Sequence, residues 1–172
     1  MQWPIGDLYS WVVFVHVGSL LAFVMGHGVS VGVLFALRRG GTIERTRTLL
    51  DLSTASFNAV YVSVLVLLVS GIVAGIMGNH FTSGRWWLWV SLALFLGIAF
   101  FMSYVRWFQM VQVRHAAGLQ TSDDIKKGIP APEPGDEAVI VAAVEKVRPW
   151  LVLVAGFGTL LVILLLMMFK PF

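Results

Sequence analysis

The sequence contains no cysteine among its 172 residues. Disulfides, thiolate metal sites, covalently attached haem and cysteine lipidation are therefore excluded. Charged residues are also scarce, at 12% of the chain, whereas they make up roughly a quarter of a soluble domain. Because 58% of the residues are hydrophobic, the composition indicates a protein that is solvated by lipid rather than by water.

The net charge of +3 does not indicate a nucleic-acid-binding protein. The Lys and Arg residues lie between apolar runs instead of on one amphipathic surface, so we interpret them as topology signals. No segment resembles a phosphate loop, a catalytic triad or a zinc-binding helix. Little of the chain lies outside the apolar runs, so we predict no catalytic residue and no nucleic-acid partner.

Four apolar runs contain no Asp, Glu, Lys or Arg, and each has about the ~20 residues needed to cross a ~30 Å hydrocarbon layer. They cover residues 8–37, 57–78, 86–105 and 150–169. We therefore predict an all-α fold, in which residues 1–172 form a single membrane domain, a polytopic bundle of four transmembrane helices. The first run does not resemble a signal peptide, because no basic residue precedes it and it is too long.

The cations between the runs predict the orientation of the bundle. Except for Arg85 and Lys170, all Lys and Arg residues lie either around the first loop or between residue 106 and the fourth run. Because Lys and Arg are enriched on the cytoplasmic side, the first loop and the loop at about 118–147 are predicted to be cytoplasmic and both termini outside. The expected location is the cell's inner (plasma) membrane, with a multi-pass topology.

The connecting segments carry their own signals. Thr42 is predicted to cap the second helix, and Gly118 to stop the third helix after it continues past the membrane. The proline-rich stretch at 129–135 predicts a stiff, extended linker. A short interfacial helix is expected at 136–146, and Pro149 is expected to begin or kink the last span.

The first run carries two histidines, His16 and His27. They are separated by about 20° around a helix and by ~16 Å along it, so they share one face. Polar side chains at membrane depth are costly and by default suggest a function, here as haem ligands, metal ligands or proton-transfer groups. The structural alternative is that each histidine makes one interhelical hydrogen bond. The opposite face carries small residues that allow close helix packing, namely Gly18, Ala22, Val29, Gly32 and Ala36.

Depth along the helices suggests a cofactor layer. At ~1.5 Å of rise per residue, His27 lies ~24 Å below Trp11, and Met102 lies ~22 Å below Trp87. Tyr61 lies about one turn into the membrane from the inner side. His and Met form a known axial pair of haem, so His27, Met102 and Tyr61 are candidate haem-binding residues. The alternative is that Met102 fills a gap in the core.

A second candidate site lies near the outer surface. Met77 and His80 are neighbours at i and i+3 on a helix and offer soft ligands to copper(I). Two ligands alone do not define a metal site, so copper ranks behind haem b as a candidate.

Four short segments resemble a known family. They are the first run with His16, the HGVS segment at His27, the basic loop that ends in LLDLS, and the glycine-containing part of the second run. Over residues 8–115 they resemble a bacterial family of small four-helix integral membrane proteins of unknown function. More remotely, the chain is similar to copper-resistance D-type domains and to haem-binding protoporphyrinogen oxidase-like membrane proteins. Those proteins use intramembrane histidines, so the resemblance implies His16 as the first residue to test.

A different class of function remains open beside cofactor binding. A proton-coupled transporter is disfavoured, because the four runs contain no carboxylate. A non-catalytic accessory or assembly subunit needs only small-residue packing faces, such as the pair Gly28 and Gly32, which the chain has. The expected partners are then the lipid bilayer and either a second copy or a larger membrane complex. An absorption spectrum of the purified protein distinguishes the two interpretations.

Overall fold

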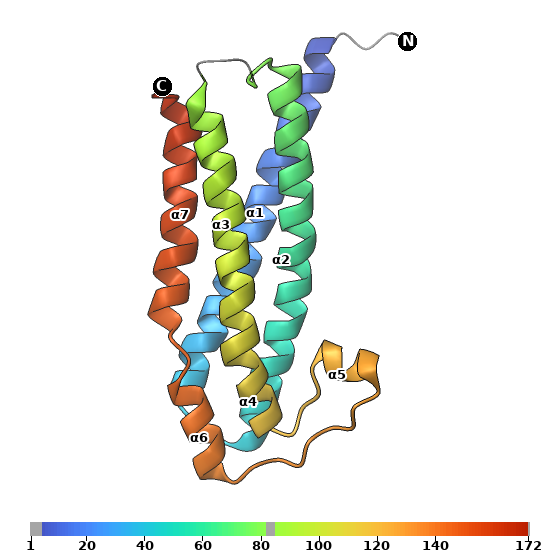
Figure 1. Cartoon of the computed structure of the whole chain (residues 1–172), viewed down its shortest axis with the longest axis vertical. Coiled ribbons are helices and arrows are strands. Elements are labelled where there is room, and N and C mark those ends of the chain that lie inside the picture. The colour runs from blue at the N-terminus through green and yellow to red at the C-terminus, as the bar shows by residue number, and fades with distance from the viewer. Residues whose placement is uncertain (1–4, 82–84, 172) are drawn as a thin grey trace.

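The computed structural model describes residues 5–81 and 85–171. All regular elements in this part of the chain are helical (Figure 1). The bounds are α1 (Ile5–Arg38), α2 (Ile43–Met77), α3 (Trp86–Val105), the π-helix η1 (Arg106–Met110), α4 (Val111–Ala116), α5 (Ser122–Lys127), α6 (Glu137–Glu145) and α7 (Pro149–Phe169). Helices α3, η1 and α4 form one continuous rod, so the bundle has four rods, each long and apolar enough to cross a membrane. The predicted all-α bundle of four spans is confirmed.

The four rods run up and down, and the bundle has two distinct ends. Helix α1 begins, and helix α7 ends, beside the turn at 78–81 and the start of α3 (Figure 1). We call this the terminal end. The opposite end holds the turn between α1 and α2 together with α5 and α6, and we call it the loop end.

Helix α2 begins at the loop end with the predicted cap. The backbone N–H of Arg45 donates to the Thr42 hydroxyl oxygen at 3.3 Å. The glycines before it have positive φ angles, 71° at Gly40 and 142° at Gly41, which reverse the chain after α1. The helix therefore begins at Ile43, well before the apolar run at residue 57. Its 35 residues measure ~52 Å, so the first turns extend beyond a ~30 Å hydrocarbon layer.

The segment between α4 and α7 contains one helix that the sequence predicts and one that it does not. Helix α6, at Glu137–Glu145, matches the expected interfacial helix, and α7 begins at Pro149 as expected. Helix α5 was not predicted. The hydroxyl of Thr121 accepts from the backbone N–H of Asp124, while the Asp124 carboxylate accepts from the backbone N–H of Thr121, which completes a capping box.

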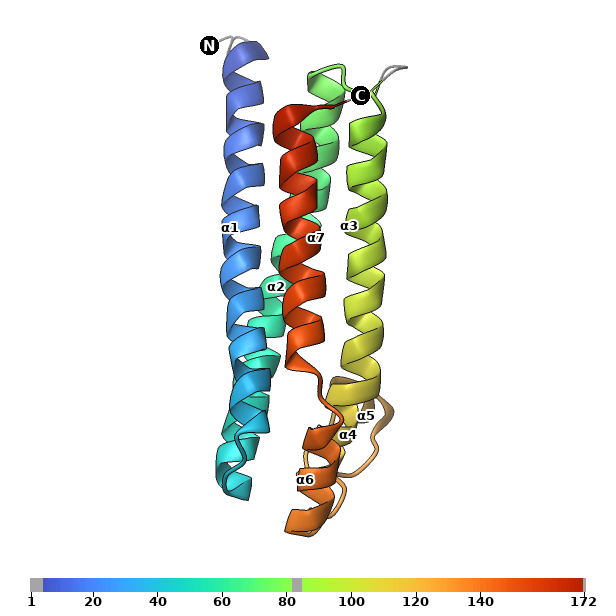
Figure 2. The ribbon, with the colours of Figure 1, turned by 90° about the vertical axis from the view of Figure 1, so that its left-hand side faces the viewer.

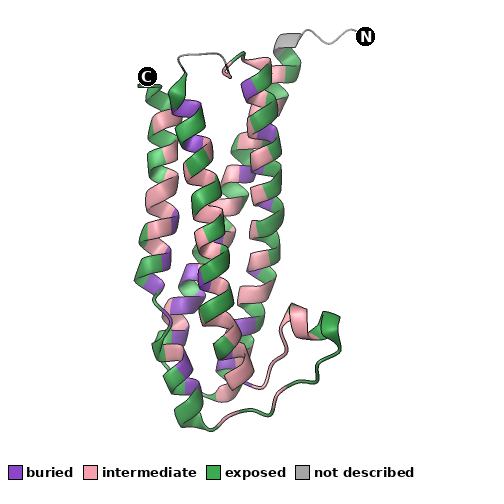
Figure 3. Ribbon diagram, viewed as in Figure 1, coloured by how far each residue is buried: buried purple, intermediate pink, exposed green. Residues whose placement is uncertain are grey.

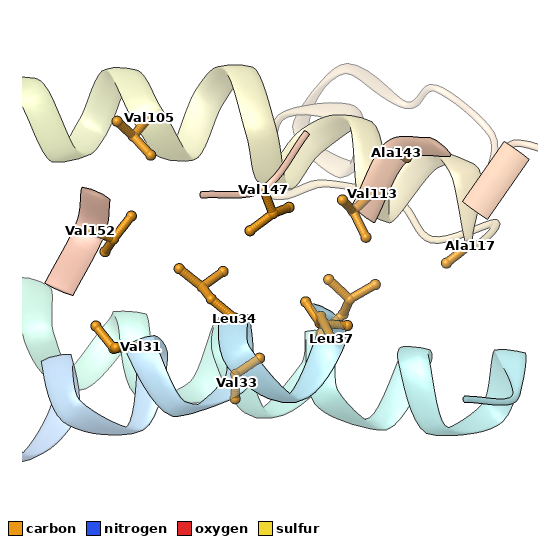
Figure 4. Close-up of a cluster of buried hydrophobic side chains, with 11 residues drawn as sticks. Val31, Val33, Leu34, Leu37, Val105, Val113, Ala117, Ala143, Val147 and Val152 are labelled. Carbon is orange, nitrogen blue, oxygen red and sulfur yellow. The ribbon is translucent and has the colours of Figure 1, made fainter. Parts of the chain in front are cut away.

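The main hydrophobic core lies at the loop end (Figure 4). Its least exposed members are Leu50 of α2, Val113 of α4, Ala117 after α4 and Val147 before α7, each 1% exposed or less. Side chains from all four rods and from α6 meet here, and the full set of buried residues is Val31, Val33, Leu34, Leu37, Leu50, Val105, Val113, Ala117, Ala143, Val147 and Val152. Elsewhere the buried positions form narrow stripes along rods whose outer faces are exposed and apolar (Figure 3).

The rods associate mainly as two pairs, α1 with α2 and α3 with α7, while α1 also touches α7 and α6 (Figure 2). Close packing of the first pair depends on small and polar residues. Ser56, Ser63 and Ser70 of α2 recur every seventh residue and are all buried. The hydroxyls of Ser30 and Ser56 lie 3.0 Å apart and join the two helices directly.

Candidate functional site

An apolar cavity of about 250 Å³ lies between the four rods in the terminal half of the bundle. Its walls are almost entirely Leu, Ile, Val and Phe side chains, and His16 is the single titratable residue among them. The lining residues are His16, Val17 and Leu20 of α1; Leu67, Leu68, Gly71 and Ile72 of α2; Phe81; Leu88, Ser91, Leu92 and Phe95 of α3; and Leu160, Ile163, Leu164 and Met167 of α7. All four rods therefore contribute to one cavity.

Hydrogen bonds fix the tautomer of His16. Its Nδ1 lies 3.1 Å from the carbonyl oxygen of Leu67 and 3.1 Å from the hydroxyl oxygen of Ser70. A carbonyl can only accept, and the Ser70 hydroxyl donates its own hydrogen to the Val66 carbonyl at 2.6 Å. Nδ1 therefore carries the hydrogen and donates it to both oxygens. The other nitrogen, Nε2, keeps its lone pair, which is the arrangement that metal-ligating histidines use.

A glycine makes room for the His16 ring. A Cβ atom on Gly71 would lie 2.9 Å from Cε1 of His16 and 3.3 Å from its Nδ1. Real Cβ atoms essentially never approach this closely, so a larger residue at position 71 would displace the ring. Gly71 thus keeps His16 against α2, in the position where Leu67 and Ser70 can bond it.

Positive charge gathers at the terminal end of the same helices. Nη1 of Arg85 donates to Nδ1 of His80 at 2.5 Å, and Nζ of Lys170 lies 5.6 Å from the centre of the buried Trp87 ring. The His80 ring also packs on Trp87, with 5.7 Å between ring centres. Burial, together with the charges of Arg85 and Lys170, lowers the pKa of His80. Arg85 and Lys170 each lie three residues from a cavity-lining residue, Leu88 and Met167 respectively.

His27 lies apart from this cavity, where α1 crosses α7. The side chain is 6% exposed, and its ring stacks on Phe23 and packs against Phe157 at 5.6 and 5.0 Å between centres. Its Nε2 is buried without a hydrogen-bond partner in the described part of the chain. Nε2 presses against Gly156, where a Cβ atom would clash with it. The ring therefore acts as a packing element that fills a notch in α7.

The other two members of the predicted cofactor layer have different surroundings. Met102 packs against the hydrophobic core at the loop end. Tyr61 is 57% exposed and stacks on Phe57, with 6.4 Å between ring centres. Neither residue, nor His27, lines the cavity that contains His16. The haem layer through His27, Met102 and Tyr61 therefore stays a prediction, and the described packing gives these residues no common space.

The electrostatics around Met77 and His80 do not favour copper. His80 accepts a hydrogen bond from Arg85 through Nδ1, and the charges of Arg85 and Lys170 act on the same ring. A copper(I) ion there would approach two cations. Within the described residues no group of three or more His, Cys, Asp or Glu side chains gathers that could hold a metal ion.

Several residues of the cavity were not identified from the sequence. Met167 lines the cavity, whereas Arg85 and Lys170 lie next to it at the terminal end. The predicted topology places the two cations at the same end of the bundle, but no spacing in the sequence indicates that Met167 shares a cavity with His16. The partners of His16 have a clearer signal. Ser56, Ser63 and Ser70 recur at heptad spacing, which is typical of a helix face that packs against another helix.

Comparison with known proteins found no matching family model, no similar curated protein and no similar solved structure. The fold and the site therefore define only a class. It is an all-α bundle with four membrane-compatible rods and a histidine-lined apolar cavity.

Proposed function

We propose that this protein is a multi-pass protein of a bacterial inner membrane that binds an amphipathic ligand in its terminal-end cavity. The observation that carries the proposal is the pair of hydrogen bonds made by Nδ1 of His16. Its Nδ1–H is held by Leu67 and Ser70, so its Nε2 is available as a ligand to a metal centre or as an acceptor for a ligand hydroxyl.

The surroundings define the chemical class of the ligand. Leu, Ile, Val and Phe walls favour an apolar body that excludes water. Arg85 and Lys170, at the ends of helices that line the cavity, favour an anionic group at the terminal end. A ligand with an apolar body, an anionic end and an atom that accepts an imidazole lone pair satisfies all three features.

Haem b belongs to this class, and its donor set fits. His16 and Met167 enter the cavity wall from α1 and α7, and His with Met is a known axial pair. Arg85 and Lys170 would meet the propionates. The cavity of about 250 Å³ is smaller than the ~300–1,000 Å³ of usual ligand pockets, so the two helix pairs must move apart to admit a porphyrin. Bound haem would supply one-electron chemistry, whereas His16 would hold and orient it.

The proposed experiment is an absorption spectrum of the protein expressed with haem supplied, in oxidised and reduced forms. We expect a Soret band in the wild type, its loss in His16→Ala, and a shift in Met167→Leu.

Leu20→Phe fills the cavity and should reduce haem content, whereas Leu21→Phe, at an adjacent residue that is 60% exposed, is the matched control. A spectrum changed by His27→Ala or Met102→Leu but not by His16→Ala would place the haem in the other layer. A colourless wild type would exclude haem.

The orientation is a part of the same proposal. The bias of Lys and Arg toward the loop end supports a cytoplasmic loop end and external termini. A reporter inserted at Pro132 in the extended linker should behave as cytoplasmic. Labelling of that position from outside the cell would reverse the orientation.

One observation favours a second candidate, an accessory or assembly subunit. A Cβ atom built on Gly18, Gly28 or Gly32 meets no atom within 4 Å, so this glycine-bearing face of α1 is open. By contrast, Gly71 and Gly75 pack against His16 and Phe81 within the chain. A second helix, from another copy or from a larger complex, would fit the open face. Gly32→Leu should then reduce oligomer size on a detergent column, and an unchanged size would exclude this contact.

A further inference from the structure

Arg106 occupies an unusual position in the third rod. It begins the π-helix η1, is partly buried, and places its guanidinium carbon 3.5 Å from the centre of the Phe57 ring of α2. Its neighbour Arg114 is fully engaged by the protein. Arg114 donates to the Leu50 carbonyl and the Thr54 hydroxyl, and it lies 3.8 Å from an oxygen of Asp51. Arg106 has no hydrogen bond or ion pair within the described part of the chain.

The depth of Arg106 matches the edge of the hydrocarbon layer. Trp87, at the terminal end of the rod, lies nineteen residues earlier, which corresponds to ~28 Å of helix and nearly the full ~30 Å thickness of the layer. Around Arg106 the rod carries exposed aromatic side chains, with Tyr104 at 54%, Trp107 at 59% and Phe108 at 51% exposure. Aromatic residues concentrate at this level of a membrane, where lipid phosphates begin.

A guanidinium at this depth needs an anionic partner. Stacking on Phe57 holds the plane of the group but satisfies none of its N–H donors. A charge left without a partner at the hydrocarbon edge is costly, and a phosphate accepts two parallel N–H bonds from a guanidinium. The π-helical turn is a local widening of the kind found at functional sites in helices.

We propose that Arg106, stacked on Phe57, binds the phosphate of an anionic lipid in the leaflet at the loop end. The occupant is a lipid rather than free phosphate, because apolar surface for acyl chains lies beside the charge: Tyr61 is exposed and stacks on Phe57, and exposed Trp107 follows Arg106 in the rod. This site lies between α2 and η1 and uses none of the cavity residues. A test of this lipid site is therefore independent of a test of the proposed function.

The test measures lipid retention on the full-length protein by native mass spectrometry after purification in a mild detergent. Phosphatidylglycerol and phosphatidylcholine are added in parallel, and inorganic phosphate forms a third arm. We expect the wild type to retain phosphatidylglycerol over phosphatidylcholine, and Arg106→Gln to reduce that retention about tenfold, as the loss of a charge-assisted bidentate contact predicts.

Two variants and one control make the result specific. Arg106→Lys keeps the charge but loses the planar fork, and Phe57→Leu keeps the arginine but loses its stacking platform, so each should reduce retention several-fold. Arg39→Gln, at an exposed loop-end cation, removes the same charge and should leave retention unchanged. Equal retention by the wild type and the Arg106 variants would overturn the proposal. Equal losses in Arg39→Gln, or displacement of the lipid by inorganic phosphate, would overturn it as well.

Discussion

The two halves of the bundle are built from the same apolar residue types but are packed in opposite ways. At the loop end, Leu50, Val113 and Val147 are at most 1% exposed and interlock with side chains from every rod. At the terminal end, the four rods line a partly open cavity of about 250 Å³. The half-buried His16 there is held by hydrogen bonds from one ring nitrogen only. The difference supports the proposal that the loop half supplies stability and the terminal half a binding site.

Energetics supports this division. An unfilled cavity destabilises a folded protein, because the atoms that line it lose contacts on one side. A chain with twelve Phe and seven Trp residues has ample volume to fill such a space. The cavity is instead lined by leucines and kept open beside Gly71 and Ser91, as expected for a site that receives another molecule.

The largest expected effect is a difference in the free energy of unfolding between two leucine variants, one on α2 and one on α3. Leu50→Ala removes a side chain from the tight core and should lower the free energy of unfolding by ~2–5 kcal/mol. Leu92→Ala removes a side chain that already borders empty space, so its cost should be smaller, less than ~2 kcal/mol. Unfolding titrations in detergent measure both. Equal losses would contradict the difference in packing between the two halves.

A second prediction concerns the junction between the halves, where His27 meets α7. Gly156→Ala places a Cβ against Nε2 of His27 and should cost ~1–3 kcal/mol through overpacking. Gly158→Ala is the matched control, because a Cβ there meets nothing within 4 Å. The double variant His27→Ala with Gly156→Ala should recover part of the loss. If the double variant loses as much free energy of unfolding as the two single variants together, then His27 does not fill this notch.

The smallest expected effect is a local pH response at the loop end. Hydrogen bonds from Thr121, and then from His115, hold the pKa of Asp124 well below its usual range. The stabilisation of α5 by this carboxylate is therefore complete above the ordinary Asp pKa of ~3.9 and is lost as the pH falls toward the lower folded value.

Amide hydrogen exchange checks this response. Protection of α5 should persist at pH 5 and decrease below about pH 4, and Asp124→Asn should remove it already at neutral pH. Asp123→Asn removes only the contact with Lys127 on the exposed side and serves as the control. Protection that is independent of Asp124 would show that the capping box does not hold α5.

The length of the apolar runs and the residues that begin or end helices predict most of the fold. The four spans follow from runs without charge, and Thr42, Gly118 and Pro149 mark helix limits where the structure places them. The capping box of α5 is also readable in the sequence but is short and surrounded by polar residues. The π-helical turn at Arg106 leaves no such signal, because its residues have no distinctive composition.

The site is less predictable than the fold, because helix rotation and the choice of neighbours decide it. His16 and His27 share one face of α1 in the sequence. In the structure, His16 borders the cavity and bonds to α2, whereas His27 packs into α7. Depth along separate helices places His27, Met102 and Tyr61 at similar levels but does not say which way each side chain points. Tyr61 and Met102 have different surroundings for that reason.

The most direct test of the cavity as a binding site is the tautomer of His16. Long-range ¹H–¹⁵N correlation spectra of protein labelled at histidine nitrogens distinguish Nδ1–H from Nε2–H, and His16→Ala assigns the signal. We predict a neutral ring with the hydrogen on Nδ1 and a bare Nε2, and the Nε2 resonance should shift when haem or another cavity ligand is added. A hydrogen on Nε2, or a His16 signal unchanged by a ligand that binds, would contradict the account.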